Sequence, residues 1–164
     1  MTELAMGRGQ NCILAAGQVH CFGFDVSGSL GIPDGPLLRH CDGANPCIET
    51  TTLVPSISGQ RFMHIGSGAS SDHTCAALEG GGLYCWGQNT DGQCGGTPDG
   101  RRDPAPVPGF ALPVVRIATG QRSTCLTTEA GALYCWGSNV DGQLGLGPAD
   151  GLLHSSPAVV LVTP

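Results

Sequence analysis

Nine cysteines give this 164-residue chain its most obvious chemistry. Thiols at fixed spacing form disulfides or, as thiolates, bind zinc. Structural zinc sites use close pairs such as Cys-x-x-Cys, and the sequence contains no such motif, so we interpret most of the cysteines as disulfide partners. Six of them fall into three similarly spaced pairs, Cys12 with Cys21, Cys75 with Cys85, and Cys125 with Cys135.

The three remaining cysteines have different surroundings. Cys41 and Cys47 flank the segment DGANP, which predicts a local disulfide stapling a loop, with a redox-active pair as the alternative. Cys94 stands where similar segments carry Leu30 and Leu144. We therefore expect it to be a small apolar core residue rather than a reactive thiol.

A possible catalytic triad is limited to Ser70, Ser71, Asp72 and His73. Neighbouring residues of a strand point to opposite faces, so Asp72 cannot readily orient His73. The sequence has no Gly-x-Ser-x-Gly elbow, and its other histidines lack metal-ligand spacing. We expect His73 to form structural hydrogen bonds, and we predict no catalytic residue, metal site or cofactor.

The elements that position these residues are set by an internal repeat. Similar segments occupy 12–31, 75–95 and 125–145, and the second and third are fifty residues apart. A period of this size is typical of an array of supersecondary units, none of which can bury its apolar face alone.

Each unit contains four short runs of β-branched or aromatic residues separated by Gly, Pro, Asn and Asp, and no long helical periodicity occurs. The sequence therefore predicts an all-β fold of three four-stranded antiparallel units. The expected strands are 4–6, 12–15, 19–22 and 51–54 in the first unit, 62–65, 74–78, 83–86 and 105–110 in the second, and 114–118, 124–128, 132–136 and 158–162 in the third.

The cysteine pairs fit this hairpin pattern. In each unit the two cysteines are equidistant from the turn that joins the second and third runs, so they should lie directly opposite each other. Facing residues of antiparallel strands have Cα atoms about 4.5 to 5.5 Å apart, within the range that a disulfide accepts.

Charge and cysteine content bound the partners and the compartment. The net charge is −6, with seven arginines and no lysine, which predicts no nucleic-acid binding. Structural disulfides imply an extracellular, periplasmic or cell-surface protein. Neither a secretory signal nor a membrane-spanning stretch is recognisable, so we expect an upstream start or a longer parent protein, with cysteines reduced in a cytoplasm as the alternative.

The strings LYCWGQNTDGQCG and LYCWGSNVDGQLGLG resemble the repeat of the regulator-of-chromosome-condensation family. The resemblance implies a seven-bladed β-propeller with four strands in each blade. It also implies binding to other proteins, which in this family include a small nuclear GTPase in eukaryotes and enzymes in bacteria. The cysteine pairs are similar to those of exported bacterial members. The first repeat departs from the pattern, with Phe22 in place of the tryptophan and Asp25 in place of the asparagine.

The signature residues have structural interpretations. The tryptophans are suited to packing between blades, the asparagines to holding a turn, and the glycines to positive φ or close approach. The Asn-x-Asp-Gly strings also resemble part of a calcium loop, but the further carboxylates and the terminal Glu are missing. The expected structural residues are Trp86, Gly87, Asn89, Gly92, Trp136, Gly137, Asn139 and Gly142.

The predicted units are 1–56, 57–110 and 111–164, and the first carries an insertion at 32–50. If Cys41 and Cys47 staple it, this insertion loses less entropy on binding, so we expect Leu37, Leu38 and Arg39 to be exposed and to contact a partner. The alternative is a loop without function.

Two functional hypotheses result. The leading one is a non-catalytic protein-protein interaction module of an exported propeller. The alternative is a hydrolase or lyase whose ring-face pocket is completed by further blades. Propellers close with four to eight blades, so three blades predict a fragment of a larger ring, an open arc or an oligomer, of which the fragment is favoured.

Overall fold

The computed structural model describes residues 2–41, 43 and 45–162. Within them the strands form three antiparallel sheets. The first has the order β1-β2-β3-β5-β4, with β1 Thr2–Met6, β2 Gln10–Ala15, β3 Gln18–Phe24, β4 Arg39–His40 and β5 Pro46–Leu53. The second is β6 Phe62–Gly66, β7 His73–Leu78, β8 Leu83–Asn89 and β9 Asp99–Pro106. The third is β10 Val114–Thr119, β11 Ser123–Thr128, β12 Leu133–Ser138 and β13 Leu153–Val160.

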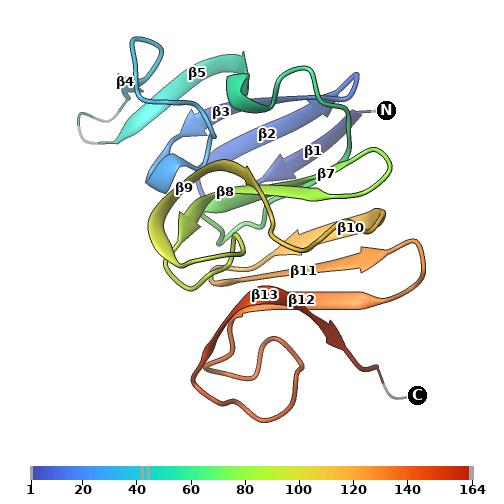
Figure 1. The fold of residues 1–164 in the computed structure, drawn as a ribbon. Helices are drawn as coiled ribbons and strands as arrows, with labels where there is room; N and C mark the ends of the chain where they lie inside the picture. The colour runs from blue at the N-terminus through green and yellow to red at the C-terminus, as the bar shows by residue number, and fades with distance from the viewer. Residues whose placement is uncertain (1, 42, 44, 163–164) are drawn as a thin grey trace.

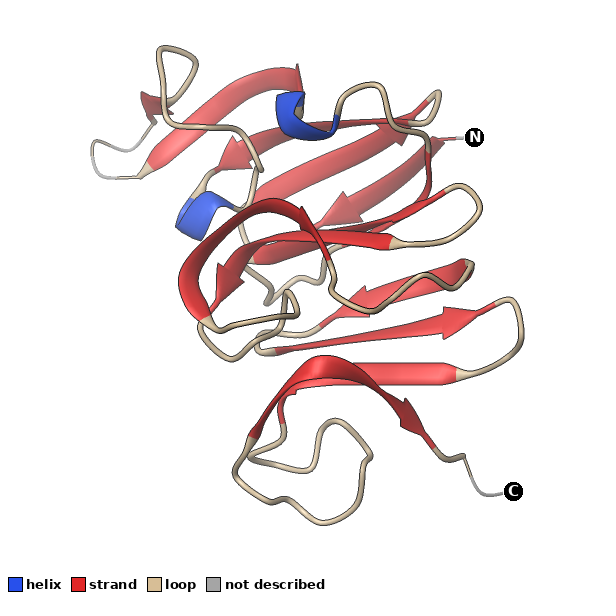
Figure 2. Cartoon of the chain, in the orientation of Figure 1, coloured by secondary structure: helices blue, strands red, loops and turns tan. Residues whose placement is uncertain are grey.

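The three sheets stack in chain order, from the blue first sheet to the red third one (Figure 1). Their first strands β1, β6 and β10 pack side by side, as the inner strands of neighbouring propeller blades do. The described helical segments are two short 3₁₀ turns, Val26–Gly28 and Pro55–Ile57 (Figure 2). The all-β prediction is confirmed, and we call the sheets blades 1, 2 and 3. The predicted unit boundaries remain predictions.

The fourth strand of each blade differs from the prediction. β5, β9 and β13 each begin at least five residues earlier than expected, in polar segments such as DGRRDPAP and LHSSPAVV. These strands lie at the outer side of the sheet, where exposure removes the alternation of apolar residues that marks an inner strand. Blade 1 also carries the additional short strand β4, which the sequence pattern does not predict.

Each hairpin of β2–β3, β7–β8 and β11–β12 places two cysteines in direct cross-strand register. All three pairs are disulfide-bonded, with Cα–Cα distances of 4.1, 4.1 and 4.2 Å. In blades 2 and 3 the next pair along the hairpin is Thr74 with Trp86 and Thr124 with Trp136. Because successive side chains alternate, each blade has a disulfide face and an opposite aromatic face.

The core is formed between blades rather than within one. One buried cluster joins the disulfide face of blade 1 to the aromatic face of blade 2, and a second joins blades 2 and 3 in the same way. Trp86 is fully buried, and its indole Nε1–H donates to the Ser29 carbonyl of blade 1 at 3.0 Å. A Cβ on Gly31 would lie 2.9 Å from this indole. Trp86 therefore packs between blades 1 and 2, against a glycine of the neighbouring blade.

The glycine after each tryptophan allows the chain to bulge. Gly87 has a φ of 99°, and a Cβ there would lie 2.5 Å from the Asp72 carbonyl oxygen. Next to it, the Gln88 N–H donates to that same carbonyl at 2.9 Å. A side chain at position 87 would therefore break the contact that ends the β7–β8 ladder.

We predict that Trp86→Phe destabilises the chain more than Trp136→Phe. The first change removes a buried N–H donor to Ser29, at a cost of about 1 to 3 kcal/mol. The Trp136 indole nitrogen has no hydrogen-bond partner among the described residues, so its change should cost roughly 1 kcal/mol less. Urea unfolding of both variants measures the difference. Equal losses would contradict a role for the Ser29 hydrogen bond.

Candidate protein-interaction surface

The insertion of blade 1 is an ordered extension of the sheet. Its last residues, 46–50, belong to β5 (Pro46–Leu53), which pairs with β3 on one side and with the short β4 on the other. A disulfide joins Cys41 to Cys47, which pairs with Arg39 in the β4–β5 ladder. The sequence predicts a stapled loop here. The insertion is stapled, but most of its second half is a strand, because β5 must cover the otherwise open edge of β3.

The three predicted contact residues lie in different environments. Leu37 is 59% exposed and Arg39 is also exposed, as expected. The expectation that Leu38 is exposed is wrong, since this side chain is half-buried and packs against the core of blades 1 and 2. Leu38 therefore anchors the insertion, and its neighbours on either side are presented to solvent.

Two recesses lie along β5, and we name them the outer and inner recess. The outer recess has a volume of about 400 Å³ and lies between the segment before β4 and β5. Leu37 and Arg39 form one wall, and Glu49, Thr50 and Thr52 form the other. An apolar side chain, a guanidinium and a carboxylate thus line one cavity, which is a suitable combination for a polar and partly apolar protein surface.

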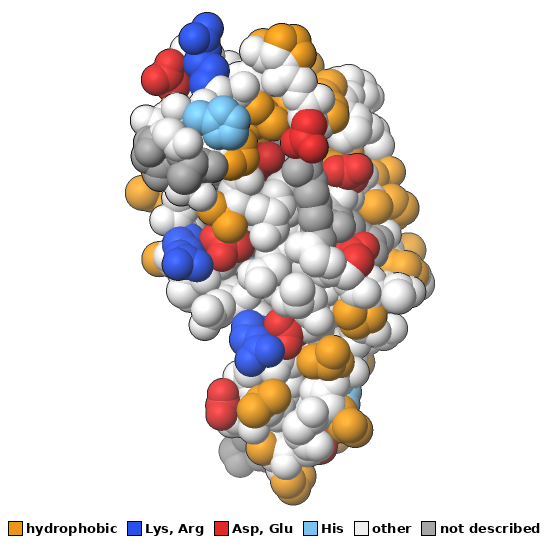
Figure 3. All heavy atoms as spheres, turned by 90° about the vertical axis from the view of Figure 1, so that its left-hand side faces the viewer, with side chains coloured by type: hydrophobic (Ala, Val, Ile, Leu, Met, Phe, Trp, Pro, Cys, Tyr) orange, Lys and Arg blue, Asp and Glu red, His pale blue; other side chains and the backbone are white. Residues whose placement is uncertain are grey.

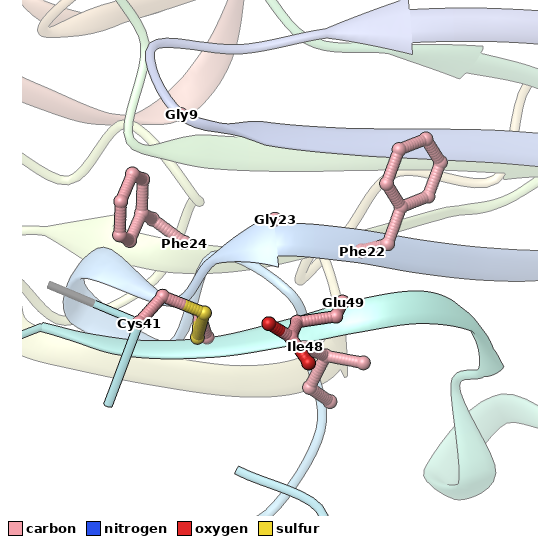
Figure 4. Close-up of a pocket in the computed structure, with 8 residues that line it drawn as sticks. Gly9, Phe22, Gly23, Phe24, Cys41, Ile48 and Glu49 are labelled. Carbon is pink, nitrogen blue, oxygen red and sulfur yellow. A yellow bond between two sulfur atoms is a disulfide. The ribbon is translucent and has the colours of Figure 1, made fainter. Parts of the chain in front are cut away.

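The inner recess has a volume of about 250 Å³ and lies between β3 and the disulfide of the insertion. Phe22 and Phe24 flank Gly23 on β3, and Ile48 comes from β5, with the Cys41–Cys47 disulfide at one end (Figure 4). In the sequence, Phe22 stands out only as a departure from the tryptophan of the other repeats. The signal that could have found this recess is the pair of phenylalanines around a glycine in the strand next to the insertion.

The candidate triad residues are part of the contact between blades. Ser71 Oγ lies 2.8 Å from His73 Nδ1, and His73 Nε2 lies 2.7 Å from Thr124 Oγ1 of blade 3. Thr124 in turn donates to the Gln93 carbonyl at 2.7 Å. Asp72 points elsewhere, to Arg8 at 3.2 Å. Ser71 and His73 have no exposed surface, so a substrate cannot reach them.

The signature asparagines hold the turns that follow β8 and β12. Asn89 Oδ1 accepts the Cys94 N–H at 2.8 Å, and Asn139 Oδ1 accepts the Leu144 N–H at 3.3 Å. Asp25 accepts the Leu30 N–H at 2.8 Å in the corresponding turn of blade 1. Gly92 and Gly142 have φ of 73° and 72° in these turns. The carboxamides thus act on the backbone of their own turns.

Cys94 is buried in the cluster between blades 2 and 3, and its thiol donates to the Gln88 carbonyl at 3.3 Å. The described residues contain no group of three or more His, Cys, Asp or Glu that could hold a metal ion. They also contain no helix with the length and hydropathy needed to cross a membrane.

Charged side chains are dispersed over the surface. On the face shown in Figure 3 the basic groups lie apart from one another, each near an acidic group. Arg122 pairs with Asp91 at 2.7 Å, and this hydrogen bond raises the pKa of the guanidinium. The prediction that the chain does not bind nucleic acid rests on this balance of charge and remains a prediction.

We predict that His73 makes the chain less stable in acid. Burial lowers the pKa of His73 from 6.5 to about 3. Between about pH 6.5 and pH 3, His73 is therefore protonated in the unfolded chain but neutral in the folded chain. The free energy of unfolding should therefore fall as the pH drops from about 6.5 towards 3, by about 2 kcal/mol at about pH 5. Urea titrations at several pH values measure this slope. The variant His73→Gln introduces the residue that blade 1 has at the equivalent position, Gln10, and should reduce the dependence of the free energy of unfolding on pH. An unchanged dependence would contradict the role of His73.

We predict that the Cys41–Cys47 disulfide stiffens the insertion alone. Replacing both cysteines by alanine should speed proteolysis between residues 33 and 47, because the short ladder of β4 cannot hold the segment by itself. The matched control is Cys75→Ala with Cys85→Ala, which should lower the stability of the whole chain by about 2 to 5 kcal/mol. Limited proteolysis and urea unfolding distinguish the two effects, and equal effects on both measurements would contradict the prediction.

Comparisons with known proteins show which proteins this chain resembles. A family model for the regulator of chromosome condensation (RCC1) repeat matches residues 68–93 and 114–143, and a second model for the same repeat matches residues 130–162. These matches cover most of blades 2 and 3. No curated protein sequence matches the chain significantly.

Solved structures show the same fold. Human WBSCR16 is 23% identical with a TM-score of 0.76, over 97% of this chain and 41% of that one. Prp20p from Saccharomyces cerevisiae is 18% identical with a TM-score of 0.78, over 98% of this chain and 38% of that one. In a complex of Kap60 with yeast RCC1 (Prp20), the matched chain is 23% identical with a TM-score of 0.74, over 99% of this chain and 35% of that one.

The chain thus spans about two-fifths of the length of the solved structures that it resembles. The matches to the repeat models and the likeness of the fold point to the same type of protein. Residues 68–93 and 114–162 therefore match the regulator of chromosome condensation (RCC1) repeat, and the three sheets have the fold of consecutive blades of an RCC1-type β-propeller.

Proposed function

We propose that the chain is a non-catalytic protein-protein interaction module of an exported RCC1-repeat protein, and that it binds its partner through the insertion of blade 1. The observation that carries the proposal is the presentation of Leu37 and Arg39 beside the outer recess, on a segment fixed at three places. Leu38 is anchored in the core, β4 pairs with β5, and Cys41 is bonded to Cys47.

A segment fixed in this way binds at low entropic cost. Most of the ordering that binding would otherwise require is already present in the free protein. The side chains are also suitable, because an exposed leucine beside an arginine and a carboxylate offers one apolar anchor and two charges for orientation. The two blades behind the insertion serve as a rigid support.

Related structures support an interaction role. Prp20p has binding properties to Gsp1p and histones, and yeast RCC1 (Prp20) has been crystallised with Kap60 bound to it. Those partners belong to those proteins. For this chain, the shared fold supports binding of a protein as the class of function, and the insertion determines which protein it is.

Export is part of the proposal because of the disulfides. The described residues form four of them, three in equivalent positions of successive blades. Such bonds persist in the extracellular space, the periplasm or at the cell surface, whereas the cytosol keeps thiols reduced. Mass spectrometry of the unreduced natural protein tests this, and free thiols at Cys12, Cys75 and Cys125 would contradict export.

We predict that Leu37→Glu with Arg39→Glu abolishes partner capture. Both residues are exposed in the free protein, so the variant should fold normally and lose at least tenfold in affinity, as truncation of an interface anchor typically costs about 2 kcal/mol or more. Point changes are preferable to deleting residues 32–50, which would remove part of β5.

The measurement is affinity capture of extracellular proteins from the source cells, followed by titration of the captured protein. Leu152→Glu is the matched control, because Leu152 is similarly exposed but belongs to blade 3. A partner lost by the insertion variant and kept by the control supports the proposal. A partner kept by both variants would place the binding surface elsewhere, and turnover of a substrate by the pure chain would contradict the non-catalytic assignment.

A further inference from the structure

The short strand β4 leaves most of the outer edge of β5 unpaired. β4 contains two residues, which pair with Pro46 and Cys47 of β5. Directly before β4 the chain turns away, since the Leu38 N–H donates to the Gly35 carbonyl at 3.1 Å. Among the described residues, no strand continues the line of β4 beside residues 48–53 of β5. In Figure 1, β4 lies at one end of β5, at the margin of the blade 1 sheet.

The backbone groups of this edge point away from the sheet. The Val54 N–H, directly after β5, donates to the Val19 carbonyl of β3 at 2.9 Å. The N–H and C=O groups of successive strand residues point alternately to the two sides of the strand, so those of Thr51 and Leu53 point to the outer side. Both residues are exposed. The edge therefore presents donors and acceptors to which a further strand could pair.

The outer strands of blades 2 and 3 carry a proline where blade 1 has a threonine. In all three blades the third-strand cysteine of the disulfide is in register with a residue of the outer strand. The residue directly before that position is Thr51 in β5, Pro104 in β9 and Pro157 in β13. Because proline has no N–H, it keeps a further strand from pairing with an edge. Blade 1 lacks this protection, and Thr50, Thr51 and Thr52 are β-branched residues that favour strand pairing.

The outer recess lies beside this unpaired edge. Its lining residues all come from the insertion and β5, with Leu37 and Arg39 on one wall and Thr50 and Thr52 on the other. A strand that paired with β5 would therefore direct every second side chain towards the recess. If this strand runs antiparallel to β5, it continues the line of β4 in the same direction, and its carboxyl end lies nearest to Arg39. A carboxylate there would complement the guanidinium.

We propose that the partner adds an extended segment to the outer edge of β5, antiparallel to it, with a carboxylate of the segment beside Arg39. The inference rests on the proposed function and specifies how the insertion holds its partner. Main-chain hydrogen bonds to the edge supply affinity, and the side chains of the recess select the segment.

A segment of another protein is favoured over a second copy of this chain. If the β5 edges of two copies paired antiparallel about Thr51, the residues beside Arg39 would come from the end of the other β5 and the turn after it. That turn, Pro55–Ile57, contains no acidic residue. The charge of Arg39 would then be left without a complement, whereas a partner segment with a carboxylate at its end provides one.

The test uses decapeptides selected from a random display library for binding to the protein, with affinities measured by fluorescence anisotropy. Thr51→Pro removes an N–H of the edge and should weaken binding about tenfold or more. This variant should fold, because blades 2 and 3 carry proline at the same position, and urea unfolding verifies it. Thr51→Val is the matched control. It keeps the N–H and the β-branched shape, so it should bind like the unchanged protein.

A charge exchange tests the orientation of the segment. We expect the selected peptides to share an acidic residue near the carboxyl end, and Arg39→Glu should weaken their binding. A peptide with lysine in place of that acid should bind Arg39→Glu better than it binds the unchanged protein. Amide hydrogen exchange should also slow at Thr51 and Leu53 when the peptide binds.

Several results would overturn the proposal: no selected peptide, equal affinities for Thr51→Pro and Thr51→Val, or a dimer of the chain that Thr51→Pro abolishes. The proposed function is tested separately with the captured partner. A partner lost by Leu37→Glu with Arg39→Glu but kept by Thr51→Pro overturns strand addition and leaves the insertion as the binding surface. A partner kept by the Leu37 and Arg39 variant overturns both.

Discussion

A single contact between blades is the physical constraint on which the rest of this structure depends. A four-stranded sheet with apolar side chains on both faces cannot be stable alone, because each face must be removed from water. Here the indole of Trp86 packs on Gly31 of the preceding blade and donates to the Ser29 carbonyl. The turn that contains Ser29 and Gly31 is itself held by Asp25. Between blades 1 and 2 the interface therefore consists of an aromatic ring on one blade and a glycine-containing turn on its neighbour.

The inner part of each blade could be predicted from the sequence because this interface imposes a strong pattern on it. Strands β2, β3, β7, β8, β11 and β12 alternate between the disulfide face and the aromatic face, and their predicted bounds differ from the observed ones by a few residues at most. The outer strands β5, β9 and β13 are in contact with solvent and carry prolines, serines and charges. Periodicity does not mark such strands, so only their pairing with the third strand of the blade defines where they begin.

The candidate interaction surface was predictable in part. The spacing of Cys41 and Cys47 inside an insertion is a local signal, and it located the segment that blade 1 adds to the repeat. The burial of the Leu38 side chain and the recess beside Phe22 depend on contacts with residues far away in the sequence. Such contacts cannot be predicted from a local sequence pattern. A sequence can thus indicate that a loop is constrained. Which side chains of the loop are exposed to a partner depends on which of them pack into the core.

The two interfaces share the pairing of a disulfide face with an aromatic face, but their polar contacts differ. Arg8 with Asp72 and Gln10 with the Ser71 carbonyl join only blades 1 and 2, while His73 with Thr124 and Asp91 with Arg122 join only blades 2 and 3. Of these groups His73 is fully buried, and loss of its partner Thr124 would leave a buried ring nitrogen without a hydrogen bond, which costs more than the hydrogen bond itself contributes. The neutral His73 is therefore a polar group specific to the contact between blades 2 and 3.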